Sequence, residues 1–144
     1  KDLLNKYGEK IILPKDIVTS TEISENSISQ NKDISEMNES DIGLDLGDKT
    51  INHLESILKC AKIVMWNGPL GYYEIEKYQH STKEILKFLT ENSIETILGG
   101  GDIVAASANL GYKEKVSHAS TGGGATLEYL EGKKLPGLEI IDEK

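Results

Sequence analysis

Two glycine triplets, at residues 99–101 and 122–124, are the feature of this chain that most clearly predicts chemistry. Glycine has no Cβ, so consecutive glycines let backbone N–H groups approach a ligand closely. Each triplet precedes a stretch typical of a helix, whose first turn adds unpaired N–H donors and a partial positive charge. Such a combination binds anions, most often phosphate. The sequence therefore predicts two cradles, either for two phosphate groups or for one phosphate that passes between them.

Asp102 directly follows the first triplet. A carboxylate beside a phosphate cradle can hold Mg²⁺, which prefers one or two carboxylates together with phosphate oxygens. The same residue can instead be the N-cap of the following helix. A glycine-rich turn is also often only a tight connection from a strand to a helix. Three glycines at the start of the second helix are harder to explain structurally, because glycine is costly inside a helix.

The composition limits the partners that this chain can have. The formal net charge of the 144 residues is −8 at pH 7, which argues against nucleic acid, since binding to its phosphate backbone needs clustered Lys and Arg. No apolar run approaches the roughly 20 residues needed to cross a bilayer, so we expect no membrane partner. Cys60 is the single cysteine, which excludes an internal disulfide and fits a reducing compartment.

All 16 basic residues are lysines, and arginine is absent. Arginine is the side chain that clamps carboxylates and phosphates in a planar, bidentate manner. A chain that handles phosphate without it depends on backbone amides, lysine and a metal ion, or on arginine from outside this sequence. A simple lysine bias in composition is the alternative explanation.

Hydrophobic periodicity and turn residues predict the secondary structure. We expect strands at residues 10–14, 42–47, 63–66 and 96–98, the third of them being the most clearly buried. We expect helices at residues 2–7, 50–61, 81–89, 104–110 and 125–131. Thr50 is predicted to cap the second of these, and Ser81 with Glu84 to form a capping box for the third. Residues 19–41 are polar and predict a surface excursion with a short edge strand.

Strands that alternate with helices predict right-handed βαβ units around a parallel sheet. We therefore expect an α/β, Rossmann-like three-layer α/β/α fold with a mostly parallel sheet, left incomplete because the strands are few. Ligands in such folds bind outside the carboxyl ends of the strands. Residues 67–69 and 99–101 both follow strands, which places them at one edge of the sheet. The pattern begins partway through, so we expect a fragment of a larger domain.

Several long segments, in order and with family-like spacing, closely resemble phosphoglycerate kinase over nearly the whole chain. They are residues 43–47 (GLDLG), 66–74 (WNGPLGYYE), 99–102 (GGGD), 116–125 (VSHASTGGGA) and 130–137 (LEGKKLPG). The resemblance implies a two-domain, hinge-bending enzyme of glycolysis, cytoplasmic and monomeric. Such enzymes transfer a phosphoryl group between 1,3-bisphosphoglycerate and Mg-ADP, which gives 3-phosphoglycerate and Mg-ATP.

In that family the N-terminal domain binds the phosphoglycerate with basic residues that include arginine, and the C-terminal domain binds the nucleotide. Residues 1–144 resemble the latter part of the nucleotide domain, with the N-terminal substrate domain absent. That would explain the missing arginines. Because domain closure brings the two ligands together in such enzymes, we expect no turnover from this chain alone.

The resemblance also implies roles for individual residues at the nucleoside end of the site. Gly43 and Leu44 would line the adenine pocket, and Glu74 would accept hydrogen bonds from the ribose hydroxyls. The residues that would flank the nucleoside and the phosphates are Asn67, Gly68, Pro69 and Leu70. From its position alone, Glu74 is also compatible with an ordinary solvent-facing side chain.

At the phosphate end, the resemblance implies contacts to the phosphates and Mg²⁺. The residues concerned are Gly99, Gly100, Gly101, Asp102 and Ile103, with Asp102 at the metal. A second set would offer amide N–H groups to the phosphoryl group in flight, which stabilises charge spread over its equatorial oxygens. This catalytic set is Gly122, Gly123 and Gly124.

Four positions depart from the family pattern. Ile103 replaces the usual Ser or Thr, so a hydroxyl near the phosphates is lost while the backbone N–H stays. Asp48 replaces a usual Pro, and residues 41–42 replace a usual Trp-Met pair. Two other functions stay open: a non-catalytic nucleotide- or anion-binding module, and a purely structural flavodoxin-like domain.

Overall fold

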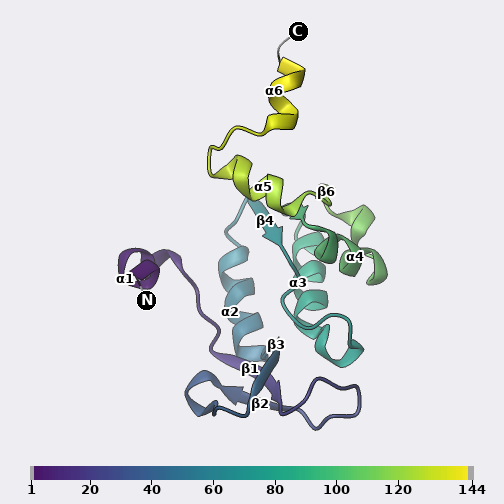
Figure 1. The fold of residues 1–144 in the computed structure, drawn as a ribbon. Coiled ribbons are helices and arrows are strands. Elements are labelled where there is room, and N and C mark those ends of the chain that lie inside the picture. The colour runs from purple at the N-terminus through teal and green to yellow at the C-terminus, as the bar shows by residue number, and fades with distance from the viewer. Residues whose placement is uncertain (1, 143–144) are drawn as a thin grey trace.

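The computed structural model describes residues 2–142, in which three consecutive strands precede a stretch where helices and strands alternate (Figure 1). The helices are α1 (Asp2–Tyr7), α2 (Asp48–Leu58), α3 (His80–Glu91), α4 (Gly101–Asn109), α5 (Gly123–Leu130) and α6 (Pro136–Asp142). The strands are β1 (Asp16–Ser20), β2 (Gln30–Asp33), β3 (Ile42–Leu46), β4 (Ile63–Asn67), β5 (Glu95–Gly99) and β6 (His118–Ser120). No helix within this part of the chain has the length and apolar character to cross a membrane.

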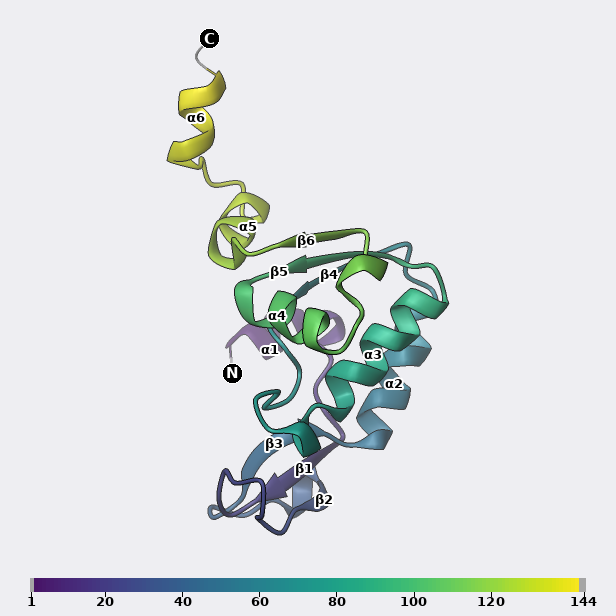
Figure 2. The same cartoon turned by 90° about the vertical axis from the view of Figure 1, so that its right-hand side faces the viewer.

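The predicted parallel sheet consists of β4, β5 and β6 in that spatial order. Helices α3 and α4 connect these strands and pack on one face of the sheet, while α2 packs beside α3 (Figure 2). The core lies between the sheet and these helices, and its buried side chains are Ile51, Trp66, Ile85, Leu86, Leu89, Leu98, Ile103 and Val104. The predicted βαβ units are therefore confirmed.

Strand β4 differs from the prediction because only one of its faces is covered. Trp66 points into the core, but Ile63 and Met65 are 58% and 39% exposed. Alternate residues of a strand face opposite sides of the sheet, and helices cover only the Trp66 side in residues 2–142. The fold is thus the expected incomplete three-layer arrangement, with one helical layer, the sheet, and a bare opposite face.

A second, antiparallel sheet was not predicted. It consists of β2, β1 and β3 in that order and lies at the far end of α2 and α3 from the parallel sheet (Figures 1 and 2). The strand expected at residues 42–47 is present as β3, but it pairs with β1 in this sheet. The edge strand expected within residues 19–41 is β2. The local pattern predicted β3 and an edge strand, whereas β1 and the pairing partners were not predicted.

The strand predicted at residues 10–14 is wrong. Gly8–Lys10 forms a 3₁₀ turn, residues 11–14 are irregular, and β1 begins only at Asp16. Leu13 is 57% exposed, and in the described chain no strand pairs with this segment. Without a partner to receive its backbone hydrogen bonds, an apolar run does not become a strand.

Helix α2 is capped from a distance, which corrects the prediction for Thr50. Gly47 occupies the N-cap position, and the Asp16 carboxylate of β1 accepts hydrogen bonds from the N–H groups of Lys49 (3.2 Å) and Thr50 (2.8 Å). A Cβ on Gly47 would overlap that carboxylate. The Thr50 hydroxyl instead accepts from the Asp16 N–H at 3.0 Å. The Asp16 side chain of β1 therefore accepts the first-turn hydrogen bonds that a local N-cap side chain would otherwise accept.

The predicted capping box at Ser81 is also wrong. The N-cap position of α3 belongs to Gln79, and no side chain caps it there. Both the hydroxyl and the N–H of Ser81 donate to the carboxylate of Asp45 in β3, the N–H at 3.1 Å. Two aspartates of the antiparallel sheet thus hold the first turns of α2 and α3.

We predict that Asp16→Asn destabilises the fold by about 1–3 kcal/mol at neutral pH, because the new amide would place a donor against N–H groups that need an acceptor. Burial opposes ionisation of Asp16, but hydrogen bonds from Asn31, Thr50 and Lys49 outweigh it and lower the pKa below the usual 3.8. A lowered pKa gives stability that is present above the unfolded value and is lost as the pH falls through the folded value.

Urea unfolding should therefore show a difference between wild type and Asp16→Asn that is largest near neutral pH and shrinks below pH 3.8. Asp33→Asn is the control, because the Asp33 side chain belongs to the same sheet, is 42% exposed and is paired with Lys49. A difference that stays constant across this pH range would contradict the assigned role of Asp16.

Candidate functional site

The predicted site segments meet at the carboxyl ends of the parallel strands, as expected. Asn67, Gly99 and Ser120 lie side by side at the ends of β4, β5 and β6. From these ends the chain enters residues 68–75, helix α4 and helix α5 respectively, all at the same edge of the sheet (Figure 2). The register of the sheet therefore places both glycine triplets and the Asn67 segment together.

The two triplets are in direct backbone contact. A Cβ on Gly123 would lie 2.8 Å from the Cα of Gly100, and a Cβ on Gly100 would lie 2.9 Å from Oδ1 of Asn67. Gly100 has a φ of 111°, a conformation that favours glycine, and its N–H donates to the Ser120 carbonyl at 2.8 Å. Glycine is thus required at position 123 by the close approach of the two backbones, and at position 100 by the nearby Asn67 oxygen and by the positive φ.

Free N–H donors point out of the first turns of the two helices. In α4 the first helical hydrogen bond runs from Val104 to the Gly100 carbonyl, so the three N–H groups before Val104 precede it. In α5 the N–H groups of Gly122 and Gly123 donate to the Ser120 hydroxyl and the Thr121 carbonyl. Of the second triplet, Gly124 is the member whose N–H has no acceptor within residues 2–142.

Asp102 lies inside the first turn of α4 and is exposed, so it is not the N-cap, a position that Gly100 occupies. Within the described residues its carboxylate forms no hydrogen bond or ion pair, and no cluster of three or more His, Cys, Asp or Glu is present. One free carboxylate beside N–H donors suits Mg²⁺ that is carried by phosphate oxygens, which needs few protein ligands. The donor set therefore fits a metal bound together with a phosphorylated ligand.

Ile103, in contrast, cannot contribute its side chain to the site. It is fully buried in the core between α4 and the sheet. Only its backbone N–H, in the first turn, is available. The departure from Ser or Thr at this position thus adds core packing in place of a polar contact.

The segment at residues 68–75, which carries Pro69, Leu70 and Glu74, is fixed by hydrogen bonds at several points. The Trp66 indole N–H donates to the Gly68 carbonyl, and Gly68 itself has a φ of 80°. The Leu70 N–H donates to the Thr82 hydroxyl at 3.0 Å. The Gln79 amide donates to the Tyr73 carbonyl at 2.6 Å. The loop is therefore held by Trp66 at its start and by Thr82 and Gln79 further along.

Gly43 and Leu44 lie in β3, in the antiparallel sheet, and not beside the glycine triplets. The Leu44 side chain is buried, and its carbonyl accepts from the N–H of Tyr72 at 2.8 Å, so β3 contacts the loop. Glu74 is exposed, and its carboxylate raises the pKa of the neighbouring Tyr72 hydroxyl. Residues 68–75 thus lead from Asn67 at the triplets to Leu44 in β3.

Asp45 is a buried residue of this region that sequence reasoning did not single out, although it lies within the GLDLG segment. Burial raises its pKa, and hydrogen bonds from Ser81 and Leu46 offset part of that effect. The signal that could have found it is an aspartate placed between two apolar residues of a strand, since a charge there needs hydrogen-bond partners.

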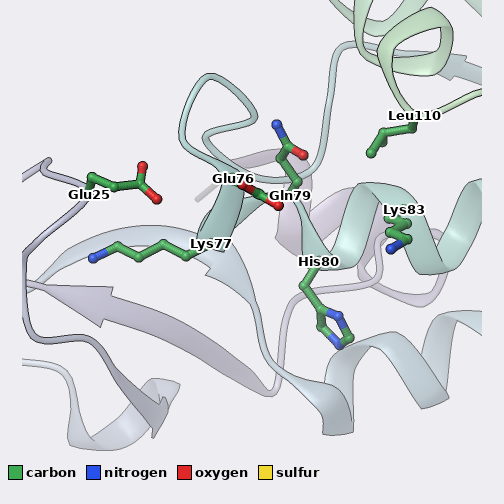
Figure 3. Close-up of a pocket in the computed structure, with 7 residues that line it drawn as sticks. All are labelled: Glu25, Glu76, Lys77, Gln79, His80, Lys83 and Leu110. Carbon is green, nitrogen blue, oxygen red and sulfur yellow. The ribbon is translucent and has the colours of Figure 1, made fainter.

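A pocket elsewhere on the surface shares none of the predicted residues (Figure 3). Its lining residues are Glu25, Glu76, Lys77, Gln79, His80, Lys83 and Leu110. The charges there are mixed, and the Lys77 ammonium is already bound to the Ser27 carbonyl at 2.7 Å. The glycine triplets therefore remain the strongest candidate for a binding site.

Comparison with known proteins agrees with this geometry. The family model described as phosphoglycerate kinase matches residues 1–133. The phosphoglycerate kinase of Lactobacillus gasseri is 46% identical over 145 aligned residues, which cover all of this chain and 36% of that protein. That of Finegoldia magna is 45% identical, with all of this chain and 37% of that protein covered.

Solved structures show the same fold. Phosphoglycerate kinase from Coxiella burnetii superposes with a TM-score of 0.88 at 31% identity, covering 99% of this chain and 37% of that one. The enzyme from Pyrococcus horikoshii OT3 gives a TM-score of 0.81 at 28% identity. The chain spans about a third of the length of the curated relatives it matches. By family model, sequence identity and fold, the chain belongs to the phosphoglycerate kinase family.

Proposed function

We propose that this chain forms the nucleotide side of a phosphoglycerate kinase, as the latter part of its nucleotide-binding C-terminal domain. The observation that carries the proposal is the convergence of Asn67, Gly100 and Gly123 beside the first turns of α4 and α5. Two helix N-termini that meet at glycine backbones form a site for a polyphosphate. Mg-ADP or Mg-ATP is the ligand we assign to it.

The proposal assigns each residue a role that is compatible with its place in the fold. The first-turn N–H groups of α4 would bind the phosphates, and Asp102 would hold Mg²⁺. Bound Mg²⁺ neutralises charge on the phosphate groups during transfer. The N–H of Gly124, with those of Gly122 and Gly123 when they exchange their present acceptors, stabilises the phosphoryl group in flight.

The nucleoside is assigned to the loop at residues 68–75 and to β3. Gly43 and Leu44 border the adenine, Asn67 to Leu70 flank the nucleoside and phosphates, and the exposed Glu74 accepts the ribose hydroxyls. The second substrate pair is 3-phosphoglycerate and 1,3-bisphosphoglycerate. With no arginine in the chain, its clamp is assigned to residues outside this sequence, in an N-terminal substrate domain. We place the enzyme in cytoplasmic glycolysis, as a monomer.

A non-catalytic nucleotide-binding module is the second candidate, and the absence of arginine favours it. Such a module would bind Mg-ADP through the same residues without transferring a phosphoryl group. We expect the 144-residue chain alone to behave in this way, with no turnover in a coupled kinase assay. Turnover by a preparation shown to be free of host enzyme would contradict that expectation.

Binding is tested by titrating the chain with Mg-ADP while following Trp66 fluorescence, since Trp66 precedes Asn67 at the site. We predict that Asp102→Asn lowers the Mg-dependent affinity about tenfold, equivalent to about 1.4 kcal/mol, because it removes the carboxylate assigned to the metal. Glu74→Gln should weaken ADP binding with or without Mg²⁺.

Glu95→Gln provides the matched control, because Glu95 is an exposed carboxylate at the opposite end of the same strand β5. It makes the same change in net charge far from the triplets and should leave the affinity unchanged. If Glu95→Gln and Asp102→Asn have equal effects, general electrostatics explains the result and the metal assignment is wrong.

The glycine contact gives a separate prediction about stability. Gly123→Ala should destabilise the fold by about 1–3 kcal/mol, because its Cβ must displace the Gly100 backbone. Gly124→Ala should be neutral or stabilising, since a Cβ there meets no heavy atom within 4 Å and alanine favours the helix. Thermal unfolding of both variants tests this contrast. Equal melting temperatures for the two variants would contradict it.

A further inference from the structure

The Asp45 carboxylate connects three segments that are distant in sequence. It lies in β3, is 3% exposed, and accepts hydrogen bonds from the N–H and hydroxyl of Ser81 at the start of α3. It also packs against Gly71 so closely that a Cβ on this glycine would overlap both the carboxylate and the Tyr78 carbonyl. Asp45 thus holds the strand, the loop and the helix at one point.

The loop at this point leads directly to the glycine triplets. Residues 68–75 begin beside Asn67, whose side chain contacts the position of Gly100, and they reach β3 where Tyr72 donates to Leu44. The Thr82 hydroxyl, one residue after Ser81, accepts from Leu70. A shift of the first turn of α3 relative to β3 would therefore move the whole loop against the triplets.

We infer that Asp45 is a positioning residue for nucleotide binding, which sets the distance and orientation between the nucleoside end of the site and the phosphate cradles. The inference rests on the function proposed above. Asp45 itself is too deeply buried to touch a ligand, so it acts through Gly71 and Ser81. Its loss should weaken the nucleoside contribution to affinity and leave phosphate binding intact.

Asp16 provides a matched control within the same sheet. It is a buried aspartate that accepts hydrogen bonds from the first turn of a helix, as Asp45 does, but that helix is α2. Helix α2 carries none of the residues assigned to the ligand. Substituting either aspartate with asparagine disturbs a helix start, and only one of these helices is attached to residues 68–75.

The test compares Mg-ADP with Mg-pyrophosphate, which has the phosphates and lacks the nucleoside. Affinities of the 144-residue chain are measured by calorimetry, with circular dichroism to confirm that each variant is folded. For Asp45→Asn we expect about tenfold weaker Mg-ADP binding and unchanged Mg-pyrophosphate binding. For Asp16→Asn we expect lower stability with an unchanged ratio of the two affinities.

Ser81→Ala keeps the N–H and removes only the hydroxyl, so it should fold and show a smaller shift of the same ratio. An unchanged ratio in both Asp45→Asn and Ser81→Ala, or an equal shift in Asp16→Asn, would overturn the positioning role alone. If the wild-type chain binds pyrophosphate but gains nothing from the nucleoside, the inference falls and the anion site stands. Failure to bind either ligand would overturn the proposed function and the inference with it.

Discussion

The site depends on a contact between two glycine backbones. Gly100 and Gly123 lie so close that a Cβ on the second would sit 2.8 Å from the Cα of the first. The contact is reached because β5 and β6 are parallel neighbours, which aligns Gly99 with Ser120 and brings the start of α4 beside the start of α5. A side chain at Gly123 would separate the two helix N-termini, whose partial charges act only within their first turns, and one at Gly100 would collide with the Asn67 amide oxygen. Glycine at both positions is therefore needed if one anion is to contact the first turns of both helices.

Two buried aspartates attach the antiparallel sheet to the helices on which the parallel sheet rests. Both satisfy the N–H groups at the start of a helix, yet their pKa values move in opposite directions. Asp16 accepts from Asn31, Lys49 and Thr50, enough to outweigh the cost of burial. Asp45 has fewer donors, and burial prevails. Loss of a partner would leave an unsatisfied buried group in either case, so both carboxylates fix a helix start against the sheet, and Asp16, whose pKa is lowered, also adds stability in its ionised form.

Local features of this fold could be predicted from sequence, and features that depend on distant partners could not. The strands before Asn67 and Gly99, and the helices after the triplets, follow from short-range pattern and were predicted. Thr50 and Ser81 have the right residue type for N-caps, but tertiary contacts give them other roles. In each helix an aspartate from the antiparallel sheet accepts the hydrogen bond from their backbone N–H. That sheet itself escaped prediction, since strand pairing is decided by contacts far apart in sequence. At the site, sequence motifs indicated the glycines and Asp102, while Asp45 emerged only from the three-dimensional arrangement.

A net charge of −8 and the absence of arginine would be expected to disfavour the polyphosphate that we propose as ligand. The repulsion depends, however, on how far the acidic side chains lie from the site. At physiological ionic strength, charges on an exposed surface are screened beyond about 8 Å. Exposed acidic residues farther than this from the triplets therefore act weakly on an anion there, whereas first-turn N–H groups act at hydrogen-bond distance. Asp102 is the exception, because it lies in that first turn and would repel a bare phosphate. With Mg²⁺ on the phosphates the same carboxylate becomes attractive. The arrangement should therefore favour the metal-bound nucleotide over the free one, through a single carboxylate set among neutral donors.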